Sequence, residues 1–490
     1  MKAPPRLFPC CLALAVALFA RPPGGLAQPA FPYDGHVPVP TRSFAVLGLP
    51  SATGGVADLA SDATGRLWVA TPQGVSALVP AVGADPAQPD TLLERAPFFP
   101  FDSQDGLLED AVSAVAFAEV GGEEHFFLGF PSGLQYGRVI STSGLSLPSD
   151  TRLSEGAPPV RALASTGATS VWAATGAGVE RWDLSGSVPT LNDTQDVFSE
   201  DEPAGAVAVF PADPTSAAYT TPGAELWVAT RGAAPVAVSV PSGVEEVLDL
   251  AFDLQGDLWV LGEGAAPTNV KVWKYGAAAL ASPGTAAPAA VFDFGELTGS
   301  DRARALAVDD TQGAVWIATS QGAYFQAWDA GRELGGSWER LATESDDVRA
   351  VYVDPAGNVW LGTDQGVEAL LLRLLSVDSS KYIGFGAQAR VTVIDVASQG
   401  AGSVEVEING VAEPVAETSA PGVFEAAFGF SEAAGAGVIQ VSSTAADTPL
   451  EFVYDFGTGS IAVRASWSNE QPFEDDLWIG NLCFIGALDR

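Results

Sequence analysis

Hydrophobic and polar residues alternate in short runs along most of this chain, and residues typical of tight turns separate the runs. In the segment 348–371, Val348 and Ala350 take alternate positions, as in a strand with one buried face. Asp-Pro-Ala-Gly at 354–357 and Thr-Asp-Gln-Gly at 363–366 divide this run from two further apolar runs. Asp accepts backbone N–H bonds in turns, and Gly adopts positive φ there. The segment therefore predicts three strands joined by two tight turns.

This three-strand pattern recurs along the chain, with an aromatic residue in the second run. The copies span 56–75, 112–134, 160–179, 207–232, 247–262, 303–323 and 348–367. Their aromatic residues are Trp68, Phe127, Trp172, Trp227, Trp259, Trp316 and Trp360. The mean interval between them is about 49 residues, and such a period indicates a repeat architecture.

A repeat of this length with one Trp is typical of a propeller blade, in which a variable outer strand completes a four-stranded sheet. A single small sheet cannot bury both faces, so neighbouring blades must stack and the ring must close. We therefore predict an all-β chain with a seven-bladed β-propeller over residues 28–375. The last repeat has no evident outer strand, and an apolar run at 43–47 precedes the first repeat. We expect the N-terminal strand to complete the last blade.

The repeat resembles the two-component regulator propeller repeat, in which the Trp and the Thr-x-x-Gly turn are characteristic elements. The likeness extends over about 320 of the 490 residues. It implies propeller blades. In that family the propeller is usually the exported sensory part of a hybrid histidine kinase, followed by a β-sandwich and a membrane helix. No kinase pattern and no such helix is recognisable in this sequence.

The repeat stops near residue 376, and a different pattern follows. Alternating runs at 390–394, 404–408, 423–428 and 450–454 predict the strands of a β-sandwich over residues 376–490. Residues 382–386, 391–395, 417–418, 422–424 and 454–455 resemble an immunoglobulin-like module of bacterial surface proteins. This resemblance implies a spacer or adhesion role. The apolar end of the chain, within 467–490, is expected to form a last strand or a docking segment.

The N-terminus has the pattern of a secretory signal peptide. Lys2 and Arg6 precede an apolar run at 7–20, and small residues at 25 and 27 mark a cleavage site. We predict a signal peptide over 1–27 and a periplasmic or extracellular protein. The most apolar later run, 367–377, is shorter than a bilayer span, so no transmembrane segment is expected in the mature chain.

Composition limits the classes of partner and of catalytic site that the sequence predicts. The chain has 60 acidic and 23 basic residues, a net charge of −37, which excludes nucleic acid as an expected partner. His36 and His125 are the only histidines, and Cys483 is the only cysteine after the signal. A His-based zinc site or a Ser-His-Asp triad is therefore not expected. The repeated Trp residues allow two interpretations, a sugar-stacking platform or packing between blades, and their fixed place in the second run favours packing.

Carboxylates cluster before the first strand of several predicted blades. The loops before those strands contain Asp105, Glu109, Asp110, Glu200, Asp201, Glu202, Glu245, Glu246, Asp301, Glu344, Asp346 and Asp347. In a propeller these loops share one face, so we expect an acidic rim represented by Asp105, Glu200, Asp301 and Asp346. One interpretation is a solvated surface that favours solubility. The other is a site for Ca²⁺, which binds flexible oxygen ligands without His or Cys, or for a cationic partner.

Three functional hypotheses follow. The first is an exported, non-enzymatic binding or scaffold protein whose propeller face recognises a protein, a glycan or a cationic ligand. The second is an enzyme similar to propeller lyases or hydrolases that use a divalent metal. The third is a periplasmic sensor subunit that acts with a separate membrane kinase. The scarcity of catalytic groups favours the first.

Overall fold

The computed structural model describes residues 36–43 and 54–469, apart from short internal stretches. These stretches are 64, 97–98, 121–122, 141–143, 147–157, 166–169, 187–188, 192–195, 199–201, 267–268, 298–300, 330–331, 445–446 and 458. The predicted signal peptide at 1–27, the rim residue Glu200 and the segment 470–490 lie outside the described residues.

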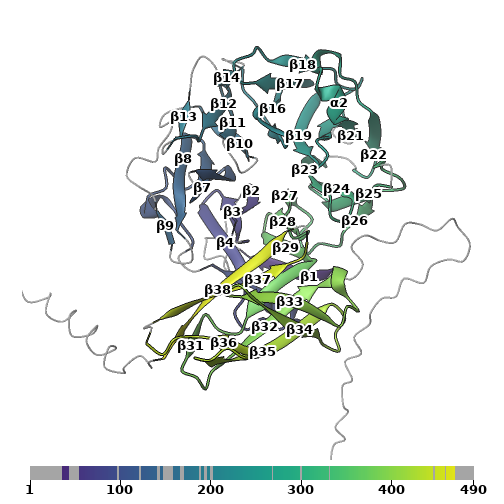
Figure 1. Cartoon of the computed structure of the whole chain (residues 1–490). Helices are drawn as coiled ribbons and strands as arrows, with labels where there is room; N and C mark the ends of the chain where they lie inside the picture. Colours follow the sequence, from purple (N-terminus) through teal and green to yellow (C-terminus); the bar gives the residue numbers. More distant parts are fainter. Residues whose placement is uncertain are drawn as a thin grey trace, which may run out of the picture.

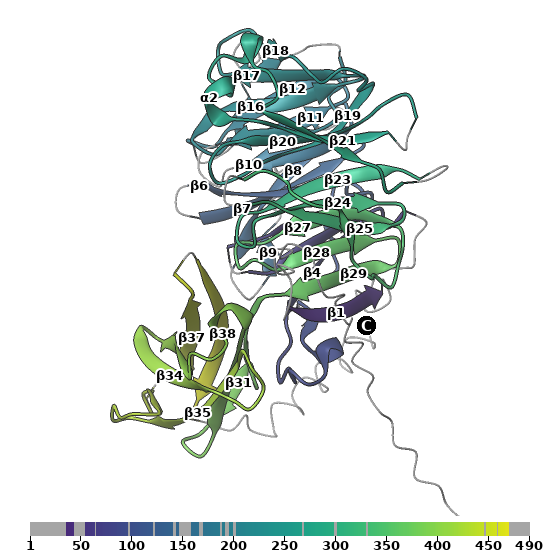
Figure 2. The same cartoon turned by 90° about the vertical axis from the view of Figure 1, so that its right-hand side faces the viewer.

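Seven antiparallel sheets form a ring, and a further sheet lies against one side of it (Figure 1). The first strands of neighbouring blades contact one another around the central axis, and the first strand of blade 7 contacts that of blade 1. Figure 2 shows the ring from its edge, with the C-terminal sheet against its lower part. The predicted all-β, seven-bladed propeller is confirmed.

In blades 1 to 6 the strands follow one another in the chain and run outwards from the axis, whereas in blade 7 the N-terminal strand is outermost. Blade 1 comprises β2 (Asp58–Ser61), β3 (Leu67–Thr71), β4 (Gly74–Pro80) and β5 (Leu93–Arg95). Blade 2 comprises β6 (Ala114–Val120), β7 (Glu123–Phe130), β8 (Gly133–Ile140) and β9 (Gly144–Ser146). Blade 3 comprises β10 (Val160–Ser165), β11 (Ser170–Thr175), β12 (Gly178–Asp183) and β13 (Thr190–Leu191), with β14 (Val197–Phe198) also on β12. Blade 4 comprises β15 (Val207–Phe210), β16 (Asp213–Thr221), β17 (Glu225–Thr230) and β18 (Val236–Val238).

The remaining blades follow the same order. Blade 5 comprises β19 (Glu246–Phe252), β20 (Leu258–Glu263), β21 (Val270–Tyr275) and β22 (Ala290–Phe294). Blade 6 comprises β23 (Ala303–Asp309), β24 (Ala314–Thr319), β25 (Gly322–Ala327) and β26 (Glu339–Arg340). Blade 7 comprises β27 (Val348–Val353), β28 (Val359–Thr363), β29 (Gly366–Leu371) and β1 (Val37–Ser43).

Helical structure in the described part of the chain is short. It comprises α2 (Ala277–Leu280) and the 3-10 turns η1 (Pro89–Thr91), η2 (Ser103–Asp105), η3 (Pro283–Thr285) and η4 (Val396–Ser398). None of these helices is long and apolar enough to cross a membrane.

The N-terminal strand closes the ring, as the sequence predicts. β1 pairs antiparallel with β29, the third strand of blade 7. The strand spans Val37–Ser43 rather than the predicted 43–47, of which 44–47 lie outside the described residues. Pro38 and Pro40 make this segment a poor strand by propensity, but an outermost strand tolerates proline because one of its edges needs no partner.

In blades 1, 5 and 7 the aspartate of the first turn accepts a hydrogen bond from the Trp of the second strand. The carboxylate of Asp62 accepts the indole N–H of Trp68 at 3.0 Å. The equivalent bonds are Trp259 to Asp253 at 3.1 Å and Trp360 to Asp354 at 2.9 Å. The other carboxylate oxygen accepts backbone N–H groups of the turn, as Asp354 does from Ala356 and Asn358. The Asp-x-x-Gly spacing thus places one carboxylate to stabilise both the turn and the core.

The interpretation of the Trp residues as core packing is confirmed for six of the seven aromatic positions and corrected for one. Trp68, Phe127, Trp172, Trp259 and Trp316 are fully buried, and Trp360 is 5% exposed. Trp227, however, lies on β17, the third strand of blade 4, and is only half-buried. Tyr219 is the fully buried aromatic residue of the second strand, β16. This register explains why the interval from Trp227 to Trp259 is the shortest in the repeat.

The C-terminal strands form one continuous sheet that curls around its own core. Their order is β30-β32-β35-β34-β33-β37-β38-β31, with β36 beside β35. The strands are β30 (Arg373–Val377), β31 (Lys381–Ile383), β32 (Gln388–Asp395), β33 (Ser403–Ile408), β34 (Val411–Glu417), β35 (Val423–Ser431), β36 (Val438–Gln440), β37 (Thr448–Asp455) and β38 (Ser460–Ser468). The predicted boundary after residue 375 falls inside β30. The immunoglobulin-like sandwich stays a prediction, because the nine strands are paired in a single sheet.

Candidate functional site

One face of the propeller carries the loops that enter the first strands. On this face, the segments that enter blades 1, 2, 4 and 5 contact the end of the second strand, or the turn after it, in the preceding blade. The N–H of Val112 donates to the carbonyl of Thr71 at 3.0 Å, and that of Val247 donates to Gly223 at 3.2 Å. The sequence prediction that these loops and turns share a face is therefore confirmed. We call this face the rim face.

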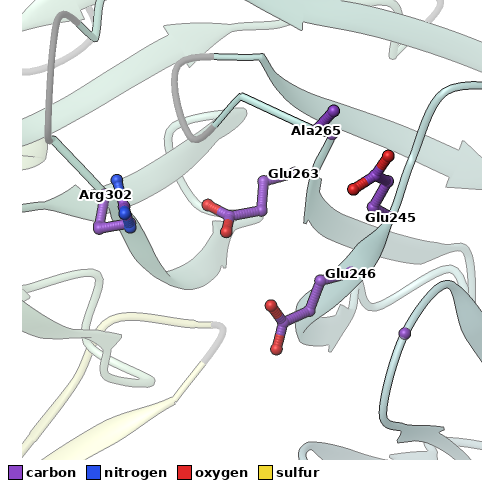
Figure 3. Close-up of a pocket in the computed structure, with 7 residues that line it drawn as sticks. Glu245, Glu246, Glu263, Ala265 and Arg302 are labelled. Atoms are coloured by element: carbon purple, nitrogen blue, oxygen red, sulfur yellow. The ribbon is translucent and has the colours of Figure 1, made fainter.

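A pocket of about 420 Å³ opens on the rim face where blades 4, 5 and 6 meet. Its lining residues are Gly223, Glu245, Glu246, Glu263, Gly264, Ala265 and Arg302. Figure 3 shows Glu263 between Arg302 on one side and the neighbouring Glu245 and Glu246 on the other. We call these residues the rim pocket. Three carboxylates and one guanidinium line it, and none of its lining residues is aromatic.

Blade 5 places Glu263 by replacing the regular turn. In blades 1, 3, 6 and 7 the second strand ends in a Thr whose hydroxyl donates to a Gly carbonyl three residues on, as Thr71 does to Gly74 at 2.9 Å. In blade 5, Gly262 pairs with Val247, as Thr363 of blade 7 pairs with Val348. A Cβ at Gly262 would lie 2.7 Å from the carbonyl oxygen of Glu246. Because only glycine permits this approach, the strand continues close to β19 and delivers Glu263 to the pocket.

Gly264, on the other side of Glu263, is constrained by close neighbours in the same way as Gly262. A Cβ at Gly264 would lie 2.5 Å from the carbonyl oxygen of Gly243. The N–H of Gly264 donates to the carbonyl of Asn269 at 2.8 Å, which closes the longer blade 5 turn. Glu263 is therefore held between two glycines whose backbone is fixed by close neighbours.

The pocket glutamates lie in an unbalanced electrostatic environment. Burial raises the pKa of Glu263, the Glu246 carboxylate raises it further, and the Arg302 guanidinium lowers it. The Oε2 atom of Glu263 is buried and has no hydrogen-bond partner among the described residues. A buried acceptor without a donor is costly, and a ligand that donates a hydrogen bond there removes that cost. The pocket is thus suited to a cation.

On the adjoining part of the rim face, carboxylates are paired with arginines. Asp347 accepts a bond from Arg304 of blade 6 at 2.6 Å and another from Arg349 of blade 7 at 2.8 Å. Arg349 also donates to the backbone carbonyl of Gly54, which enters blade 1. These ion pairs neutralise the rim where blades 6, 7 and 1 meet.

Of the four carboxylates that represent the predicted acidic rim, Glu200 lies outside the described residues, and the other three have different partners. Asp105 belongs to η2 and accepts the backbone N–H of Asp102 within a capping box. Asp346 forms an exposed ion pair with Arg340. Asp301 and Asp346 both act on Tyr324, whose pKa is raised by burial and also by their charges. Among the residues that the structure describes, no three His, Cys, Asp or Glu side chains are grouped to hold a metal.

Glu263 is the pocket residue that the sequence analysis missed. The signal was available as a break in the repeat, because Thr-x-x-Gly is replaced in blade 5 by Gly-Glu-Gly and a longer turn at 262–269. Departures from a local rule are expected at functional sites. Glu245 and Glu246, by contrast, were included in the predicted rim.

Comparisons with known proteins give one family match and several structural neighbours. Residues 344–365 match the family model described as two component regulator propeller. No curated protein matches this chain.

Solved structures with a similar fold include extracellular domains described as parts of hybrid two component systems of B. thetaiotaomicron, BT4673 and BT3049. The BT4673 domain has 13% identity and a TM-score of 0.47, over 85% of this chain and 52% of that one. The BT3049 domain has 12% identity and a TM-score of 0.45, over 85% and 56%. Streptogramin B lyase has 12% identity and a TM-score of 0.45, over 68% and 98%. This chain thus spans about half the length of the two component domains.

Proposed function

We propose that this protein is an exported, non-enzymatic binding protein that holds a small organic cation in the rim pocket. The observation that carries the proposal is a pocket in which Glu245, Glu246 and Glu263 outnumber Arg302. Its volume of about 420 Å³ lies in the range of small-molecule sites, roughly 300–1,000 Å³.

The lining of the pocket indicates which cation it suits. Aromatic cages recognise quaternary ammonium groups, but no aromatic ring lines this pocket. Carboxylates instead accept charge-assisted hydrogen bonds from protonated primary amines, each of which has three donors. Three carboxylates beside one guanidinium leave a formal charge of −2, which matches a molecule with two amines. We therefore expect diamines, or peptides with two basic side chains, to bind best.

Ca²⁺ remains our alternative ligand for the rim face. It needs six to eight oxygen ligands at about 2.3–2.6 Å, which a pocket of this size provides only if its loops contract. The amine hypothesis requires no such movement. The match of residues 344–365 to the two component regulator propeller model favours a sensing use of the bound ligand, with a separate membrane partner that receives the signal.

No observation favours the lyase alternative. His36 precedes β1, and His125 lies on β7, where its Nδ1 atom is 3.0 Å from the carbonyl oxygen of Glu123. Neither histidine lines the rim pocket.

Calorimetric titration and thermal melting of the purified protein at low salt test the proposal. Putrescine should bind and raise the melting temperature, because a ligand that binds only the folded state stabilises it. Butylamine, with one amine, should bind more weakly, and salt should weaken both because it screens charge. Glu263→Gln should weaken putrescine binding by about tenfold or more, since it removes a charged acceptor.

The control is Asp105→Asn, which neutralises a rim carboxylate outside the pocket and should leave binding unchanged. If Ca²⁺ binds and putrescine does not, the site is a metal site and the amine hypothesis is wrong. If putrescine, a lysine-rich peptide and Ca²⁺ all fail to bind, the binding function itself is overturned.

A further inference from the structure

The C-terminal sheet buries both faces of its first two strands. β30 pairs with β32, and Leu374 lies directly opposite Ile394 in this ladder. Leu375 and Val393, their neighbours along the two strands, face the core of the C-terminal sheet itself. Leu374 and Ile394 face the other way and pack into a cluster of propeller residues.

The propeller residues in that cluster are those that close the ring. Val39 of β1 and Leu371 of β29 come from the two strands that join the N-terminus to blade 7. Val56 and Leu59 come from the start of blade 1. The cluster therefore covers the seam between the last blade and the first, which is the one place where the ring is not continuous in sequence.

Polar contacts fix the same junction. The Arg373 side chain is 8% exposed and donates from Nη1 to the carbonyl of Ala356, in the first turn of blade 7, at 2.8 Å. Its Nε atom lies 3.4 Å from a carboxylate oxygen of Asp395, and its guanidinium lies 4.5 Å above the ring of Phe456. Both of these partners belong to the C-terminal sheet.

The backbone is fixed at the same point. Asn358, 4% exposed in blade 7, accepts the N–H groups of Leu372 and Arg373 at 2.8 and 2.9 Å. On the blade 1 side, the N–H of Gly83 donates to the carbonyl of Val377 at 3.1 Å. The chain between the propeller and the sheet is therefore held to both blades of the seam, unlike a flexible spacer.

We propose that the C-terminal sheet acts as a clasp that holds the propeller ring closed. β1 is a short outermost strand with an irregular register between Val39 and Arg42, and it depends on buried contacts to stay in place. Leu374 and Ile394 extend, from outside the propeller, the apolar cluster that contains Val39 of β1, and β30 contacts β4 of blade 1. Loss of the clasp frees β1 and opens the ring between blades 7 and 1, while blades 3 to 5 stay closed.

Hydrogen exchange of the full chain, read by mass spectrometry, tests this inference with a matched pair of variants. Leu374→Ala and Leu375→Ala remove the same side chain from adjacent positions of β30, one facing the seam and the other facing the core of the sheet. Leu374→Ala should speed exchange in β1 and β29 by about tenfold or more, because the seam opens locally. Leu375→Ala should speed exchange within β32 and β35 and leave β1 as in the unmodified protein.

Ile394→Val gives a milder loss at the seam if Leu374→Ala does not fold, and it should raise exchange in β1 to a smaller extent. The clasp is disproved if the seam variants leave β1 exchange unchanged. It is also disproved if Leu375→Ala speeds exchange in β1 as much as Leu374→Ala does, since β1 would then respond to any loss of stability in the sheet.

Discussion

Blades 7 and 1 follow the repeat closely, whereas blades 4 and 5 depart from it, and the two pairs differ in what their rims present. In blades 7 and 1 the Trp, the Asp-x-x-Gly turn and the Thr-x-x-Gly turn are all in place. There the rim carboxylate Asp347 is neutralised by two arginines. In blades 4 and 5 the Trp is displaced or the second turn is rebuilt, and the rim glutamates outnumber Arg302. The regular blades 7 and 1 thus meet where the ring closes, whereas the irregular blades 4 and 5 line the pocket.

The comparison is sharpest for one pentapeptide that occurs twice. Leu-Trp-Val-Ala-Thr forms β3 at 67–71, and the same five residues lie within β17 at 226–230. Trp68 is fully buried, with its indole N–H on Asp62, whereas Trp227 is half-buried, with its indole N–H 3.2 Å from the Thr221 hydroxyl. The difference comes from the residues before the pentapeptide, because an Asp-x-x-Gly turn precedes only the first copy.

Truncation of the two Trp side chains should therefore have unequal effects. Trp68→Ala removes a fully buried indole and should lower the free energy of unfolding by about 3–5 kcal/mol. Trp227→Ala should cost about 1–2 kcal/mol, because part of that ring already contacts solvent. Denaturant midpoints of the two variants measure the difference. Equal losses would mean that blade 4 depends on its Trp as blade 1 does.

The two regions share one feature, an aspartate on the first strand, which the pattern of apolar residues did not reveal. Asp58 of blade 1 accepts the N–H of Val115 in blade 2 at 2.9 Å, and Asp249 of blade 5 accepts that of Leu306 in blade 6 at 2.7 Å. Burial raises the pKa of Asp58 to about 7 and that of Asp249 to about 6. Backbone N–H bonds lower both pKa values, whereas the negative charge of Asp249 raises the pKa of Asp58 further.

These raised pKa values predict that stability falls as pH rises. Between the unfolded value of 3.8 and the folded values of about 6 and 7, the folded state keeps protons that the unfolded state releases. The stabilisation is complete below pH 4 and is lost as pH passes through 6 to 7. From pH 5 to pH 8 we expect a loss of about 1–3 kcal/mol. Urea unfolding at the two pH values measures it.

The double variant Asp58→Ala/Asp249→Ala separates this effect from the general repulsion of a chain with a net charge of −37. Alanine occupies the aligned position in other blades, for example Ala114 and Ala350, so the backbone accepts it. The variant should show a smaller change between pH 5 and pH 8. An unchanged slope would assign the pH dependence to net charge alone.

The sequence predicted the fold well because the fold depends on a repeated local rule. Asp, Gly, Trp and Thr at fixed spacing determine two turns and one buried aromatic side chain, and the copies of the repeat predict the same local structure. The pocket could not be predicted in the same way. Glu263 acts through its contact with neighbouring blades, and whether a rim carboxylate is paired depends on arginines from other blades, such as Arg304 with Asp347. The packing of Leu374 on the seam is likewise a contact between distant segments.

Neutralising one carboxylate on each part of the rim should have opposite effects on stability. Asp347→Asn breaks two partly exposed ion pairs, of which the pair with Arg304 joins blades 6 and 7, and it should lower the free energy of unfolding by about 1 kcal/mol. Burial and the charge of Glu246 both raise the pKa of Glu263, so the ionised carboxylate is unfavourable in the folded state. Glu263→Gln removes this charge and should increase stability by a few tenths of a kcal/mol to about 1 kcal/mol at neutral pH.

Melting temperatures of the two variants, measured at low and high salt without ligand, show whether each substitution raises or lowers stability. Salt should reduce both effects, since both arise from charge. A rim in which every carboxylate serves stability would give two losses. A gain for Glu263→Gln together with a loss for Asp347→Asn would mean that the pocket keeps its charge at a cost in stability, which is expected of residues retained for binding rather than for folding.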